Sequence, residues 1–104
     1  MPVTELDGHV VHVDDEGFLT VYEEWDDELA KTLATNIGVG LTDEHWQAIR
    51  FLRADFQQQG ETATLRRVST IGGIPTKRLF ELFPKKPAKK MAYIAGLPKP
   101  HGCV

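Results

Sequence analysis

The chain has 104 residues, enough for one domain with a modest hydrophobic core. Hydrophobic residues make up 41% of it and charged residues 26%, as in ordinary globular proteins. The sequence shows no secretory signal pattern and no apolar run of about 18 residues, and its single cysteine excludes an internal disulfide, so we expect a cytoplasmic protein without a membrane span.

The net charge of −3 hides an uneven distribution of charged residues. Residues 1–64 carry 14 acidic and three basic residues, whereas residues 65–104 carry nine basic residues and one acidic residue. This division indicates either a basic face for an acidic partner, protein or nucleic acid, or two halves of one domain that attract each other. Both interpretations stay open at this point.

Short β-strands are expected within the first 22 residues. The stretches HVVHV (9–13) and FLTVY (18–22) are rich in β-branched and aromatic residues, and the turn-forming DDEG separates them. We expect a meander of two or three strands. Because so small a sheet is unstable alone, it is expected to pack on helices.

Two amphipathic helices are expected next. Asp26 is a typical N-cap, and the apolar stripe of the first helix is Leu29, Leu33 and Ile37. Thr42 is expected to cap a longer helix that ends at Gly60. The stripe of this second helix is Trp46, Ile49, Leu52 and Phe56.

Shorter helices are expected in the C-terminal half. Residues 62–83 predict two helices about a Gly-Gly turn, with Thr62 at the start of the first and Pro75 near the first position of the second. A fifth helix is expected from Pro87 to a C-terminal Gly96. The elements together predict an α+β fold.

The sequence offers little for several kinds of chemistry. Its four histidines and one cysteine lack the spacing of a metal site, and neither a nucleophile elbow nor a phosphate-binding loop is present. The two short helices resemble a helix-turn-helix, with basic residues Arg66, Arg67, Lys77 and Arg78. A regulator that binds nucleic acid or protein is therefore an alternative, although the apolar second helix and the overall acidity oppose DNA binding.

The C-terminal tail carries the most distinctive pattern. Pro98 and Pro100 favour an extended course, and Gly102 leaves the penultimate Cys103 uncrowded. A thiolate is the reactive form of cysteine, and Lys99 and His101 are candidates to stabilise its charge. Because no general base stands beside Cys103, the pattern is typical of a carrier and not of a self-sufficient active site.

The segment LFELFPKKPAKKMAYIAGLPKPHGCV resembles the C-terminal signature of the DsrC/TusE family, the gamma-subunit-like proteins of dissimilatory sulfite reductase and their sulfur-relay relatives. The earlier blocks DEGFL, GVGLTDEHWQAIRFLR and TLRRV are similar to the family's other motifs, in the same order. The resemblance implies a single domain over residues 1–104. Its fold would be a small N-terminal β-meander packed on about five helices, with a helix-turn-helix-like element and a flexible C-terminal arm over residues 95–104.

The resemblance also implies a function. Cys103 would carry sulfane sulfur as a persulfide between partner proteins, in tRNA thiolation or in sulfur oxidation or reduction, and Arg66 would match an arginine that holds the sulfur near the body. Gly96, Pro98, Pro100 and Gly102 would shape the arm. DsrE/TusD-like or heterodisulfide-reductase-like proteins are the expected partners, no metal or other cofactor is expected, and neither nucleic acid nor membrane is expected to bind directly.

Two departures from the family's pattern shape the expectation. Ala92 stands where sulfite-reductase members have a second arm cysteine, so no disulfide can form within this arm. The stretch between RRV and LFELFP is also shorter than in many relatives. The chain therefore resembles the single-cysteine, TusE-like members more than an accessory subunit of sulfite reductase, which stays a further alternative. The sequence leaves the sulfur donor, the acceptor and the pathway open.

Overall fold

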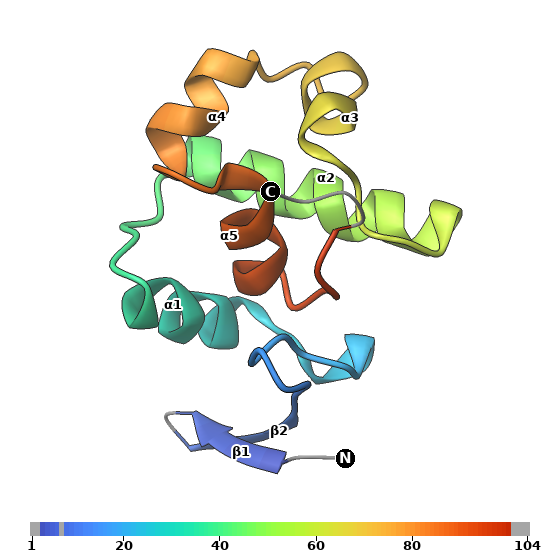
Figure 1. The fold of residues 1–104 in the computed structure, drawn as a ribbon. Helices are drawn as coiled ribbons and strands as arrows, with labels where there is room; N and C mark the ends of the chain where they lie inside the picture. Colours follow the sequence, from blue (N-terminus) through green and yellow to red (C-terminus); the bar gives the residue numbers. More distant parts are fainter. Residues whose placement is uncertain (1–2, 7, 101–104) are drawn as a thin grey trace.

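In the part of the chain that the structure describes, a two-stranded hairpin and five α-helices form the fold (Figure 1). The structure is a computed structural model that describes residues 3–6 and 8–100. In chain order the elements are β1 (Val3–Leu6), β2 (His9–His12), the 3₁₀-helix η1 (Tyr22–Glu24), α1 (Asp27–Asn36), α2 (Asp43–Gln59), α3 (Leu65–Thr70), α4 (Thr76–Leu82) and α5 (Pro87–Ile94). The expected α+β fold, a small sheet packed on five helices, is confirmed.

The N-terminal sheet has two strands in the described residues, within the expected two or three, but one expected strand is missing. β1 and β2 pair antiparallel, from Val3 opposite His12 to Leu6 opposite His9. The predicted strand over 18–22 is wrong, because only Leu19 pairs, in an isolated bridge to Val13. Phe18 and Leu19 are neighbours and both are buried, whereas a strand would turn them to opposite faces. This segment therefore wraps around the core edge instead of extending the sheet.

The two longer helices begin and end where their caps predict. The carboxylate of Asp26 accepts the Leu29 N–H at 2.8 Å, and Gly60 ends α2 in the left-handed conformation. At the start of α2 the Thr42 N–H donates to His45 Nδ1, so Nε2 carries the ring proton and donates to the Leu82 carbonyl at 2.7 Å. His45 thus fastens the start of α2 to the end of α4.

The short helices differ in detail from the prediction. Thr64, not Thr62, caps α3 by accepting the Arg67 N–H at 3.2 Å, and Pro75 occupies the N-cap position of α4. The Gly-Gly turn is confirmed: a Cβ on Gly72 would lie 2.4 Å from the Val68 carbonyl oxygen, and Gly73 has φ +77°.

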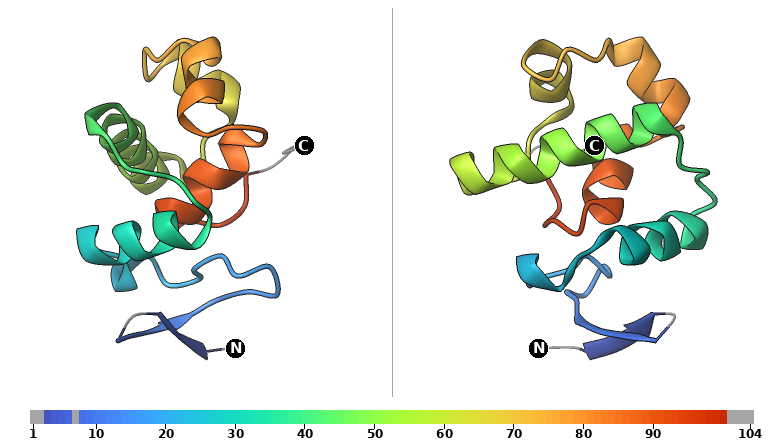
Figure 2. Two further views of the ribbon diagram at one scale, coloured as in Figure 1. Left: turned by 90° about the vertical axis from the view of Figure 1, so that its left-hand side faces the viewer. Right: turned by 180° about the vertical axis from the view of Figure 1, so that it is seen from behind.

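Helix α5 lies at the centre of the helical array, between α1 and α2 (Figures 1 and 2). Its residues Met91, Ala92 and Ile94 are fully buried. Ala92, which stands where some relatives have a second cysteine, lies in this helix, as its place between Pro87 and Gly96 predicted. Because α5 is fixed on several sides, the chain leaves the body from a rigid support. Among the described residues, no helix combines the length and apolarity that a membrane crossing requires.

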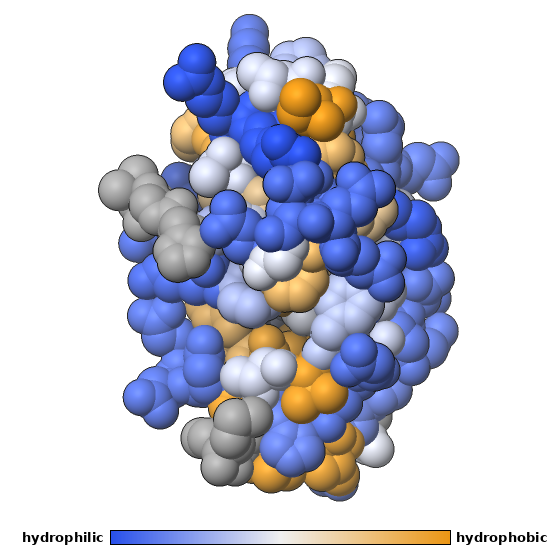
Figure 3. Space-filling model, turned by 90° about the vertical axis from the view of Figure 1, so that its right-hand side faces the viewer, coloured by the Kyte–Doolittle hydropathy of each residue, from blue (hydrophilic) through white to orange (hydrophobic). Residues whose placement is uncertain are grey.

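The surface seen in Figure 3 is mainly hydrophilic, and hydrophobic residues emerge on it as separate patches. Of the large hydrophobic side chains in the described part, the exposed ones are Val3, Val10, Ile71 and Phe80. The apolar residues of α4, Leu79, Phe80 and Leu82, predict that all three side chains are buried, and Phe80 is the exception. It is 46% exposed, because the buried side of that helix is already filled by Leu79 and Leu82.

Candidate functional site

The chain leaves α5 through a tightly specified turn at Gly96. The Leu97 N–H donates to the Ala92 carbonyl and the Gly96 N–H to the Tyr93 carbonyl, which is the Schellman arrangement. Gly96 has φ +69°, and a Cβ there would lie 2.4 Å from Trp25 Cδ1. Only glycine satisfies both constraints, so this residue sets the direction of residues 94–100, called the arm base below.

Two side chains hold the carbonyl groups that the end of α5 leaves without helical partners. The indole Nε1–H of Trp25 donates to the Ile94 carbonyl at 2.8 Å. Arg53 Nη1 donates to the Ala95 carbonyl at 2.7 Å, and its Nη2 donates to the Tyr22 carbonyl at 3.0 Å. The arm base is therefore bonded to α2 and to the segment before α1.

Arg53 lies between two aromatic rings. Its guanidinium carbon is 3.8 Å from the Tyr22 ring centroid and 4.1 Å from that of Trp25. Burial lowers the pKa of Arg53, yet an arginine side chain stays charged at neutral pH. Aromatic faces and two carbonyl groups thus replace the water that this cation would otherwise bind.

Beyond the turn, the arm base follows the body surface. Leu97 is fully buried, and the buried hydroxyl of Thr62 donates to the Pro98 carbonyl at 2.7 Å. Lys99 is exposed and forms an ion pair with Glu16 at 3.4 Å. Pro100, the last described residue, is buried. The body therefore contacts the arm from the region of α3 on one side and from the loop after β2 on another.

The structure brings only part of the predicted site together. Gly96, Pro98, Lys99 and Pro100 lie in the arm base, whereas Arg66 lies on α3 and is exposed. The other predicted site residues, His101, Gly102 and Cys103, lie outside the described residues.

The two neighbouring arginines of α3 have different surroundings. Arg67 forms a bidentate ion pair with the buried Asp55 of α2, with distances of 2.8 and 2.9 Å. The Asp55 carboxylate raises the pKa of Arg67. The guanidinium of Arg66 has no hydrogen bond or ion pair within the described part of the chain. Arg67 thus fastens α3 to α2, and Arg66 is the arginine that is available to an external anion.

A small cavity of 220 Å³ lies next to this ion pair. Asp55, Arg67 and Thr62 contribute to its walls, and Thr62 is also the residue that holds the Pro98 carbonyl. The cavity therefore adjoins the arm base, and it is open to the solvent side where Glu61 and Thr64 are exposed.

Sequence reasoning missed the residues that position the arm base: Trp25, Arg53, Thr62 and Glu16. Their contacts with the arm base join residues that are distant in the chain, and no local pattern reveals such pairs. One signal was available for Arg53. It follows Ile49 by four residues and precedes Phe56 by three, so it falls on the apolar stripe of α2, where a cation requires a partner.

In the helix-turn-helix-like pair α3 and α4, the guanidinium of Arg78 is bonded to carboxylates of the protein itself. Arg78 Nε donates to Glu44 at 2.8 Å, a second nitrogen of the same guanidinium also bonds Glu44, and a third donates to Glu81 at 3.0 Å. The bonds to Glu44 fasten α4 to the start of α2, and the bond to Glu81 lies within α4. The geometry therefore does not favour the alternative in which Lys77 and Arg78 read nucleic acid.

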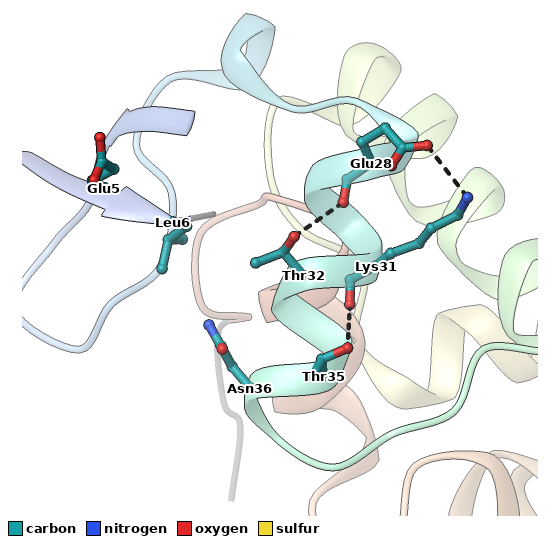
Figure 4. Close-up of a pocket in the computed structure, with 7 residues that line it drawn as sticks. All are labelled: Glu5, Leu6, Glu28, Lys31, Thr32, Thr35 and Asn36. Carbon is teal, nitrogen blue, oxygen red and sulfur yellow. Dashed lines mark hydrogen bonds and ion pairs between the residues drawn. The ribbon is translucent and has the colours of Figure 1, made fainter. Parts of the chain in front are cut away.

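A larger groove of 620 Å³ separates the hairpin from α1 (Figure 4). Its polar side chains bond within α1: Lys31 pairs with Glu28 at 3.4 Å, and the Thr35 hydroxyl donates to the Lys31 carbonyl at 2.9 Å. Leu6 and Glu5 of β1 form the opposite wall. The groups of this groove do not converge on a common point, so we do not take it as the functional site.

Comparisons with known proteins agree on one family. The sequence model of the family described as "DsrC like protein" matches residues 5–104. The "Sulfurtransferase TusE" of Yersinia pseudotuberculosis is 35% identical over 107 residues, with 96% of this chain and 99% of that protein covered.

Two solved structures extend the agreement to the fold. The crystal structure of dissimilatory sulfite reductase I (DsrI) is 36% identical, with a TM-score of 0.84 over 99% of this chain and all of that one. The oxidized gamma-subunit of the dissimilatory sulfite reductase (DsrC) from Archaeoglobus fulgidus is 38% identical, with a TM-score of 0.77 over 99% of this chain and all of that one.

Proposed function

The chain belongs to the DsrC-like protein family, and on this premise we propose that it is a sulfur carrier that holds sulfane sulfur as a persulfide on Cys103 and passes it between partner proteins. The strongest support is the similarity to a TusE sulfurtransferase, which covers 96% of the chain. The chain has a single cysteine, Cys103, so this is the residue that can hold the sulfur.

The proposed transfer is an exchange at sulfur without net oxidation. The Cys103 thiolate attacks the outer sulfur of a persulfide on the donor protein, and a bond forms between Sγ and that sulfur. The S–S bond of the donor breaks, and its electron pair leaves with the donor thiolate. Attack by an acceptor thiolate on the loaded Cys103 repeats the same exchange and restores the free thiolate.

The arm base gives this chemistry a fixed origin. We propose that the moving part of the arm begins after Leu97, because Gly96 and Leu97 are buried and the neighbouring carbonyl groups are bonded to Trp25 and Arg53. The polar contacts beyond Leu97 are weaker and can open: one neutral hydrogen bond from Thr62 and the exposed ion pair of Lys99. From Leu97 to Cys103 the extended chain spans about 20 Å. Such a reach is enough to bring a sulfur atom into a partner's site while the body stays outside.

We propose Arg66 and Lys99 as the cations that stabilise the negative charge on sulfur, with His101 as a third. Arg66 is exposed and has no internal partner in the described part of the chain. Lys99 shares its charge with Glu16 across 3.4 Å, and both side chains are more than 40% exposed. An exposed ion pair of this kind is weak, so Lys99 can exchange Glu16 for a sulfur anion with little loss.

The function is tested by loading with sulfur. The reduced protein is incubated with inorganic polysulfide, and intact-mass spectrometry records the gain of one sulfur atom. We expect this gain in the parent protein, its reversal by dithiothreitol and its absence in Cys103→Ser. Loading that persists in Cys103→Ser, or no loading at all, would contradict the proposal.

The role of Arg66 needs a matched comparison. Arg66→Gln should slow the loading of Cys103 several-fold, because a cation near the thiolate lowers its pKa. Lys77→Gln also removes an exposed positive charge, from α4, and should leave the rate within twofold. Equal loading rates in the two variants would show that Arg66 does not stabilise the Cys103 thiolate.

A further inference from the structure

A second cleft, rimmed by lysines, opens between α5, the end of α1 and the loop after β2. Its volume is 440 Å³. The half-buried Ile37 and Tyr93 contribute apolar surface, and the buried Phe18 ring supports Tyr93 from behind, edge to face with centroids 5.9 Å apart. The basic residues around it are Lys85, Lys86, Lys89 and Lys90. With apolar walls inside a basic rim, the cleft can bind both an apolar side chain and negatively charged groups.

These four lysines differ from most other cations of the protein. Of the eight other lysines and arginines in the described part, five are held by a carboxylate, namely Lys31, Arg50, Arg67, Arg78 and Lys99. None of the four lysines forms an ion pair with any described residue. The charge at this cleft is therefore available to a partner.

The surroundings of the four lysines do little to neutralise their positive charge. Among the described residues that line the cleft, the only acidic one is Glu16, and Lys99 already pairs with it. Lys89 and Lys90 lie in the first turn of α5, a turn without acidic residues, where the helix dipole disfavours cations. Lys85 has φ +77°, an uncommon conformation for a residue with a side chain. The positions of Lys85, Lys89 and Lys90 therefore lower the stability of the free protein instead of raising it.

We propose that this cleft docks an acidic segment of a partner protein, with one aromatic or aliphatic side chain against the apolar wall and flanking carboxylates on the four lysines. The inference deepens the proposed function and rests on it for the identity of the partner as a sulfur donor or acceptor. Because Glu16 lines the cleft and also pairs with Lys99 of the arm base, a partner docked here lies beside the point where the arm leaves the body.

The chemistry of the cleft favours a peptide over nucleic acid. A nucleic-acid surface tracks a phosphate backbone with a row of cations and usually stacks bases on exposed rings. Here Phe18 is 98% buried, with only 2% of its surface accessible, and the acidic residues Asp14 and Asp15 precede the loop residue Glu16. A single apolar anchor between carboxylates matches both the walls and the rim.

The test uses the full chain and a defined probe. The probe is a fluorescein-labelled peptide with a central Phe-Leu pair and three acidic residues on each side, followed by anisotropy and by amide chemical shifts in ¹⁵N-labelled protein. We expect saturable binding, with shifts centred on Phe18, Ile37 and Tyr93. Replacement of all four lysines by glutamine should weaken binding at least tenfold, whereas Lys77→Gln should change it less than twofold. A peptide with Ala-Ala at its centre should also bind more weakly.

Several outcomes would overturn the inference: no binding at millimolar peptide, shifts centred elsewhere, equal affinity in the four-lysine variant, or tighter lysine-dependent binding of duplex DNA than of the peptide. The result is separable from that of the proposed function. Polysulfide loads Cys103 without a docked protein, so the four-lysine variant should load at the parent rate. If Cys103 fails to load while the peptide still binds, the sulfur-carrier function is rejected and the docking role of the cleft is retained.

Discussion

The arm base and the lysine-rimmed cleft are neighbours, yet they are built in opposite ways. In the arm base, the carbonyls of Ile94, Ala95 and Pro98 each accept a hydrogen bond from the body. In the cleft, four cations form no ion pair with the part of the chain that the structure describes, and two of them lie at the unfavourable end of a helix. Satisfied polar groups fix a geometry, whereas unsatisfied surface charge is available for binding.

The difference has a consequence for mutations. Changes in the arm base should destabilise the free protein, because they remove contacts that the folded state already makes. Changes in the cleft should weaken binding while the free protein becomes no less stable. The two regions can therefore be distinguished by measuring the free energy of unfolding and the affinity on the same variants.

The largest loss of stability is expected for Gly96→Ala. The new methyl group would collide with Trp25 and would also have to adopt φ +69°. Together these effects should lower the free energy of unfolding by about 3 kcal/mol. Urea denaturation measures it, with Gly38→Ala as the matched control: that glycine has φ +72° but nothing within 4 Å of its added Cβ. Equal losses in both variants would show that Trp25 gives way.

Arg53→Gln should have the second largest effect. It removes two charged hydrogen bonds, to the Ala95 and Tyr22 carbonyls, and the contacts with two rings. We expect a loss of about 2 kcal/mol. Arg50→Gln on the same helix removes an exposed ion pair with Asp27 and should lose well under about 1 kcal/mol. A comparable loss at both positions would mean that Arg53 does not hold the arm base.

The ease of predicting these regions from sequence also differs. The turn at Gly96 was predictable because a glycine after an apolar helix is a local signal, as were the caps Asp26 and Gly60. The bonds from Trp25 and Arg53 were not, because they join residues 69 and 42 positions apart. Their existence depends on how the helices pack, which no local pattern states.

The errors have physical causes as well. The segment 18–22 has strand-forming residues, but its two consecutive buried side chains, Phe18 and Leu19, do not fit an alternating strand. Thr62 was assigned to start a helix because threonine is a good N-cap. Thr64 fills that role, and the Thr62 hydroxyl serves the Pro98 carbonyl instead. Tertiary contacts therefore decided both cases over local preference.

Thr62→Val gives a smaller and more local effect. Valine keeps the shape of threonine but loses the hydrogen bond to the Pro98 carbonyl, so we expect a loss of about 1 kcal/mol. Amide hydrogen exchange should become faster at Leu97, whose N–H is bonded to the Ala92 carbonyl, while that of α2 changes little. Thr62→Ser retains the hydroxyl and should retain most of the protection. Unchanged exchange in Thr62→Val would show that the hydrogen bond does not restrain the arm base.

The smallest expected effect has the opposite sign and separates the two regions most sharply. Lys89→Gln with Lys90→Gln removes two cations from the positive end of α5, so the free energy of unfolding should rise by about 0.5 kcal/mol at low salt. The gain should shrink as salt is added, because salt screens the interaction with the helix dipole. The same double variant should bind the acidic peptide more weakly. If the double variant is instead less stable than the parent, these lysines stabilise the fold. The contrast with the arm base then fails, because both regions would be structural.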